Sequence, residues 1–91
     1  MSALYDYDED VLVQEVESKE YEIVLYNDDV NTFDYVIDTL VSICKHTPIQ
    51  AEQCAMLVHY KGKCSVKSGI FKELEHKCSL LLDAGLTADI Q

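Results

Sequence analysis

Residues 21–44 read YEIVLYNDDVNTFDYVIDTLVSIC, and this stretch decides the fold. Its first six residues are mostly aliphatic, β-branched or aromatic, which is typical of a strand. The turn-forming run Asn27-Asp28-Asp29 ends that strand. The apolar residues that follow recur every three or four positions, as on the buried face of a helix, and Asn31 or Thr32 can cap it. The stretch therefore predicts a strand, a tight polar turn and an amphipathic helix.

A second helix is predicted to begin at Thr47-Pro48-Ile49-Gln50. Threonine at the cap, proline at the first helical position and glutamine three residues after the cap form a capping box. Gly62 is a natural helix stop. Beyond it, Cys64 and Val66 alternate with polar neighbours, which predicts a short strand over residues 63–67.

Ser68 can cap a third helix, which we expect Gly85 to end. Apolar residues then alternate with polar ones over residues 86–90, which predicts a final strand. The element order is β-α-α-β-α-β. We expect an α+β fold, a two-layer α/β sandwich in which a small three-stranded sheet packs against three helices.

The chain has 91 residues, enough for one domain with a single core. Seven of the seventeen acids fall within residues 1–20 against one lysine, so we predict a flexible acidic extension there and a folded domain over residues 21–91. The extension either solubilises the protein or engages a partner. A net charge of −10 with no arginine disfavours binding to nucleic acid. No stretch reaches the length of a membrane span.

The four cysteines show no spacing typical of a zinc site, and the N-terminal region lacks the features of a signal peptide. We therefore expect free, mostly buried thiols in a reducing cytoplasm, and neither a metal nor a cofactor. Of the three histidines, His46 and His76 are interpreted as solvent-facing. His59 differs because it follows Val58, the last apolar residue on the inward face of the second helix.

The turn Asn27-Asp28-Asp29 offers hydrogen-bond acceptors beside an apolar helix face, and His59 can face the same place. Together they predict a site for a ligand that is cationic at one end and hydrophobic at the other. Catalysis is disfavoured, because adjacent turn carboxylates usually point apart and the cysteines are interpreted as core residues.

Residues 26–36, YNDDVNTFDYV, followed by residues 58–63, VHYKGK, resemble the ClpS family of adaptors of the ATP-dependent Clp protease. The resemblance implies an N-degron recognition adaptor. It would bind substrates that begin with Leu, Phe, Tyr or Trp and deliver them to a Clp AAA+ unfoldase, ClpA or ClpC. It also implies that Asn27, Asp28 and His59 bind the substrate's α-amino group. The implied side-chain pocket consists of Asn31, Phe33, Val36, Ala55, Val58 and Leu86.

Two alternatives remain open at the level of sequence. The first is a protein-interaction domain of the same architecture with another partner, like the C-terminal domain of the ribosomal stalk protein L7/L12. The second, ranked last, is a small hydrolase that uses His59 with Asp28.

Overall fold

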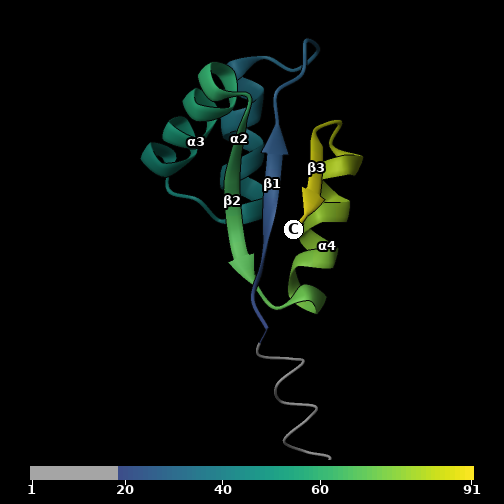
Figure 1. Cartoon of the computed structure of the whole chain (residues 1–91). Coiled ribbons are helices and arrows are strands. Elements are labelled where there is room, and N and C mark those ends of the chain that lie inside the picture. Colours follow the sequence, from purple (N-terminus) through teal and green to yellow (C-terminus); the bar gives the residue numbers. More distant parts are fainter. Residues whose placement is uncertain (1–18) are drawn as a thin grey trace, which may run out of the picture.

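The computed structural model describes residues 19–91, so most of the predicted acidic extension over residues 1–20 lies outside the described part. The described elements follow the predicted β-α-α-β-α-β order (Figure 1). They are β1 (Tyr21–Tyr26), α2 (Phe33–Cys44), α3 (Pro48–Lys61), β2 (Lys63–Gly69), α4 (Phe71–Asp83) and β3 (Thr87–Ile90).

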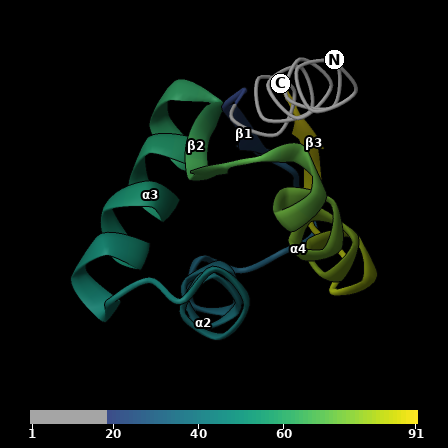
Figure 2. The same ribbon diagram turned by 90° about the horizontal axis from the view of Figure 1, so that it is seen from below.

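The three strands form one antiparallel sheet in the order β2-β1-β3, with β1 in the centre. Figure 2, which looks along the sheet, shows α2, α3 and α4 together on one side of the strands. The predicted α+β, two-layer arrangement of three strands against three helices is therefore confirmed.

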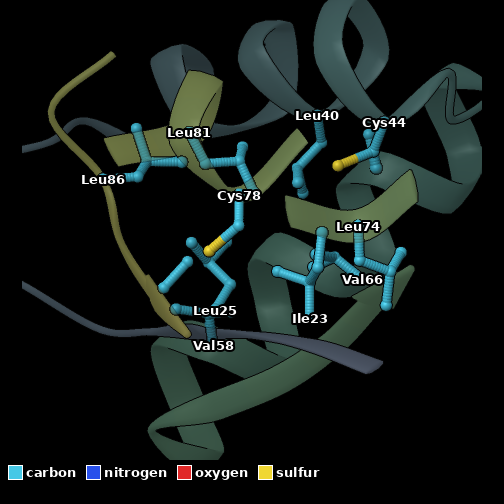
Figure 3. Packing of buried hydrophobic residues seen from close by; sticks show 12 residues of the cluster. Ile23, Leu25, Leu40, Cys44, Val58, Val66, Leu74, Cys78, Leu81 and Leu86 are labelled. Atoms are coloured by element: carbon cyan, nitrogen blue, oxygen red, sulfur yellow. The ribbon is translucent and has the colours of Figure 1, made fainter. Parts of the chain in front are cut away.

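The core lies between these two layers. Ile23 and Leu25 alternate on the central strand and point toward the helices, where Leu40 and Leu81 meet them (Figure 3). All four side chains are at most 1% exposed. Because one central strand supplies this contact, the turn that follows β1 is held at a fixed place relative to the helices.

The helix ends follow the predicted capping signals with one exception. Thr32 caps α2 by accepting a hydrogen bond from the backbone of Tyr35, and the capping box at Thr47 is formed. Gly62 ends α3 with φ of 91°, a left-handed conformation that glycine adopts without strain. The prediction that Ser68 caps the third helix was wrong.

Ser68 belongs to β2, where it pairs with Glu22 of β1. The strand extends two residues beyond the predicted end, because pairing with β1 continues to Gly69. The cap position of α4 falls to Ile70, whose side chain makes no capping hydrogen bond. Tertiary pairing here overrides the local capping preference.

The interpretation of His46 as solvent-facing was also wrong, since its side chain is only 5% exposed. Its Nε2–H donates to the carbonyl oxygen of Val66 at 2.6 Å. The strand register explains this bond. Ile23 pairs with Lys67 and Val24 with Ser65, so Val66 is an extra, bulged residue of β2. His76 is exposed, as predicted.

All four cysteines are free; Cys44 and Cys78 are buried, and Cys54 and Cys64 are half-buried. No group of three or more metal-ligating side chains occurs within residues 19–91. In the same part of the chain, no helix is both long and apolar enough to span a bilayer.

Candidate functional site

A cavity of about 600 Å³ lies between the turn that follows β1, the start of α2 and one face of α3. Cavities of this size, mostly apolar with a few polar groups, are typical of small-molecule and peptide side-chain sites. The residues that line it are Asn27, Asp28, Asp29, Asn31, Phe33, Val36, Glu52, Ala55, Met56, Val58, His59 and Tyr60.

Eight of the nine predicted site residues line this cavity, and Leu86 does not. Leu86 is 4% exposed and belongs to the hydrophobic core, where Ala88 and Leu81 also lie. Its backbone N–H donates to the carbonyl of Leu81 and so satisfies one of the last carbonyls of α4. It therefore packs in the core beside the end of α4, and its predicted place in the cavity wall stays a prediction.

The turn is held rigid by the carboxylate of Asp28. Its Oδ1 accepts the backbone N–H groups of Val30 at 2.9 Å and Asn31 at 2.8 Å, and its Oδ2 accepts the Asn31 side-chain amide at 2.8 Å. The hydrogen bond from the Asn31 backbone is the main reason that the pKa of Asp28 lies below its ordinary value; partial burial opposes this shift, and the other two hydrogen bonds reinforce it. Asp28 therefore remains negatively charged at neutral pH.

Asn31 extends this network to the loop that follows α4. Its Nδ2 also donates to the carbonyl oxygen of Gly85 at 2.9 Å, and the hydroxyl of Tyr35 donates to the carbonyl of Ala84. The start of α2 is thus tied to the turn between α4 and β3. Asn31 lines the cavity, but its amide hydrogens are already engaged within the protein.

His59 lies in the last turn of α3, and its exposed ring packs edge-on against Tyr60 with 4.8 Å between ring centroids. Backbone hydrogen bonds join the end of α3 to the turn that follows β1. Asn27 N–H donates to the Gly62 carbonyl at 2.9 Å. Gly62 N–H in turn donates to the carbonyl of Val58 at 3.0 Å. These bonds hold the Asn27 carboxamide and the His59 imidazole on the wall of one cavity.

The apolar part of the cavity has a buried floor and an exposed rim. Ala55 and Val58 are 3% and 5% exposed and form the floor, while Val36 is half-buried. Phe33 and Met56 are 41% and 44% exposed and stand at the rim. An apolar side chain that enters the cavity would cover these rim residues, and burial of such surface is favourable.

The charges around the cavity are of one sign. Asp28, Asp29 and Glu52 line it, and within residues 19–91 no lysine does. Clefts lined by one sign of charge attract counter-charged groups and raise their local concentration. The arrangement therefore suits a ligand with a cationic head and a hydrophobic side chain.

Asp29 belongs to the turn that was predicted to face the ligand, but three further lining residues were not predicted, namely Glu52, Met56 and Tyr60. The signal for two of them was present in the sequence. Glu52 and Met56 precede His59 by seven and three residues, and such spacings place side chains on one face of a helix. A search for residues that share the helix face of His59 would have found both.

Known proteins resemble the part of the chain that carries these residues. The sequence model of the family described as "ATP-dependent Clp protease adaptor protein ClpS" matches residues 16–89. The chain is 32% identical over 69 residues to the ATP-dependent Clp protease adapter protein ClpS of Treponema denticola, covering 76% of this chain and 68% of that protein. It is also 37% identical over 59 residues to the E3 ubiquitin-protein ligase UBR1 of Drosophila melanogaster, covering 65% of this chain and 3% of the ligase.

Among solved structures, Agrobacterium tumefaciens ClpS2 bound to L-phenylalaninamide has the same fold. The TM-score is 0.68 at 20% sequence identity, and the match covers 81% of this chain and 96% of that chain. The match of the family model, over residues 16–89, includes every element that contributes to the cavity.

Proposed function

Because the chain belongs to the ClpS family of ATP-dependent Clp protease adaptor proteins, we propose that its cavity binds the first residue of substrate proteins. The ligand class is a free N-terminus that carries Leu, Phe, Tyr or Trp, an N-degron. The family is one of adaptors and not of proteases, so the protein's task is recognition. The observation that carries the proposal is the convergence of Asn27, Asp28 and His59 on one apolar cavity.

The polar end of the cavity fits an α-amino group. Such a group has a pKa of about 7.7–8.0 and is mostly cationic at neutral pH. The Asn27 carboxamide oxygen and an imidazole nitrogen of His59 can accept its hydrogens, and the Asp28 carboxylate supplies negative charge nearby. Hydrogen bonds to a charged group contribute about 1.5–3 kcal/mol each.

The apolar end fits a large side chain. Burial of a Leu or Phe side chain contributes about 1.5–3 kcal/mol. After the cost of association, the two ends together support a dissociation constant on the order of 1 μM, or about −8 kcal/mol. L-phenylalaninamide, the ligand of the Agrobacterium protein, combines a free α-amine with a benzyl side chain, which supports this division of the cavity.

We further propose that the bound substrate is delivered to a Clp AAA+ unfoldase, ClpA or ClpC, in the cytoplasm. The family description, which names an adaptor of the Clp protease, supports a protease partner of this kind. The free thiols of all four cysteines accord with a reducing compartment.

Calorimetry tests the binding proposal with a peptide that begins with Phe and the same peptide acetylated at its N-terminus. Acetylation removes the charge and with it two charge-assisted hydrogen bonds. We therefore expect affinity to fall about a hundredfold or more. His59→Ala should cost about tenfold or more with the free peptide. His76→Ala, which removes an exposed histidine on α4, is the matched control and should bind normally.

The other outcomes favour the alternatives. Binding that ignores acetylation, or that is equal in the two histidine variants, would support an interaction domain like that of L7/L12. Cleavage of the peptide on long incubation would support a hydrolase based on His59 and Asp28.

A further inference from the structure

A second cleft, of about 330 Å³, lies where the turn between α2 and α3 meets β2. Lys45, His46 and Gln50 form one wall, and Ser65, Lys67 and Ser68 line the strand side. We call it the lysine cleft. It shares no residue with the cavity described above, so its ligand is independent of the proposed function.

The lysine cleft is electrostatically unlike the rest of the protein. The chain carries seventeen acids against seven lysines, yet two lysines and no carboxylate line this cleft within residues 19–91. The hydroxyls of Ser65 and Ser68 add neutral donors beside them. Ammonium and hydroxyl donors that converge on one small cleft suit the oxygens of an anion.

The buried histidine adds a second requirement. Its Nε2–H donates to the Val66 carbonyl, so in the neutral ring Nδ1 carries a lone pair and can only accept. Nδ1 is buried and has no hydrogen-bond partner within residues 19–91. A buried acceptor without a donor is unfavourable. A ligand that satisfies the cleft must therefore bring a hydrogen-bond donor as well as negative charge.

We propose that the lysine cleft binds a phosphate group that carries a proton. Lys45 and Lys67 pair with its anionic oxygens, and its P–OH group donates to Nδ1 of His46. Sulfate has the same shape and charge but no such proton at neutral pH, so the cleft discriminates between the two. Nδ1 is buried in the structure, so the proposal requires the side chains that line the cleft to move when phosphate binds.

Inorganic phosphate carries such a proton at pH 7, and a small phosphomonoester, whose second pKa is about 6, carries one in its minor monoanionic form. NMR titration of the ¹⁵N-labelled protein at pH 7 and constant ionic strength distinguishes them, with inorganic phosphate, glycerol phosphate and sulfate as separate probes. Binding of both phosphates identifies a phosphomonoester site, and binding of inorganic phosphate alone identifies an ion site. Either result supports the proposal.

We expect saturable shifts at residues 44–50 and 65–68, and a change in the ¹⁵Nδ1 resonance of His46 with phosphate but not with sulfate. Sulfate should bind about tenfold more weakly, the factor that one ordinary hydrogen bond supplies. Lys67→Gln should weaken phosphate binding severalfold. Lys72→Gln, which removes an exposed lysine on α4 outside the cleft, is the control and should have no effect.

Three results would overturn the proposal: shifts that do not saturate, equal affinity for phosphate and sulfate, or equal phosphate binding in the two lysine variants. The first would mean weak screening of surface charge, and the second a general anion site without a role for Nδ1. None of them bears on the peptide experiment, because the peptide cavity uses other residues.

Discussion

At the scale of single residues, the turn after β1 depends on Asp28 more than on its neighbours. Three hydrogen bonds converge on its carboxylate, two from the backbone and one from Asn31. The side chain of Asn31 also donates to the carbonyl of Gly85 and so connects this turn to the loop after α4. A residue that was predicted to assist in binding the α-amino group thus also fixes the shape of the site.

The lowered pKa of Asp28 predicts an acid-sensitive contribution to stability. The folded state holds its proton less tightly than the unfolded chain, so the stabilisation is present above the ordinary pKa of 3.8 and is lost as pH falls below it. Between pH 7 and pH 3, the free energy of unfolding measured with urea should fall less in Asp28→Asn than in the wild type. Asp38→Asn, exposed on α2, is the control, and a loss as small as that of Asp28→Asn would contradict this account.

Cys54 provides a second prediction at this scale. Burial is the largest cause that raises the pKa of its thiol to about 12, and the neighbouring Cys64 and Cys44 add to the shift. Since only the thiolate reacts, alkylation of Cys54 by iodoacetamide at pH 8 should be slower than that of a free thiol by about two orders of magnitude or more. Mass spectrometry of the labelled protein measures this rate. In denaturant the rate should become ordinary; fast labelling of the folded protein would contradict the prediction.

At the scale of elements, α3 is the helix that the sequence specified most completely. The capping box at Thr47, Pro48 at the helix start and Gly62 at its end are local signals, and all three occur in the structure. Ser68 failed as a cap because its pairing with Glu22 is decided by the sheet. His46 was misjudged for the same reason, since its partner Val66 lies twenty residues away.

The cap of α3 can be tested directly. Thr47→Ala removes the hydroxyl that accepts the backbone N–H of Gln50 at 3.2 Å. We expect a loss of about 1 kcal/mol in the free energy of unfolding, measured by urea denaturation with an unchanged m-value. Ser79→Ala, exposed within α4, should change stability by about 0.5 kcal/mol or less. Equal effects of the two variants would show that the capping box is not stabilising.

The candidate site was predictable where its residues followed one another in sequence or on one helix face. Asn27 and Asp28 stand in one turn, and Ala55, Val58 and His59 share α3. The surroundings of Leu86 could not be predicted in this way. Whether a residue beside the final strand faces a cavity or the core depends on packing between elements.

At the scale of the whole molecule, the charge distribution has a kinetic consequence. The net charge is −10, and three carboxylates surround the peptide cavity. Long-range attraction of a cationic N-terminus should speed association at low salt, and screening should remove much of this gain.

Stopped-flow kinetics with a peptide that begins with Phe tests this attraction. Glu52→Gln should slow association a few-fold at about 10 mM salt, with little effect at about 500 mM, because the Debye length shrinks from about 30 Å to a few ångströms. Glu75→Gln carries the same change of net charge on α4, away from the cavity, and should have a smaller effect. Identical rates for the two variants would mean that only total charge matters.

The central position of β1 has a consequence for synthesis on the ribosome. This strand emerges early, yet one of its two partners, β3, ends at Ile90, and Glu22 exchanges two backbone hydrogen bonds with Gln91. A nascent chain halted before these residues leave the exit tunnel would hold β1 with one side unpaired, and such long-range pairing is slow to form. The turn Asn27-Asp28-Asp29, which follows β1, would then take its final shape only after the whole domain has left the tunnel.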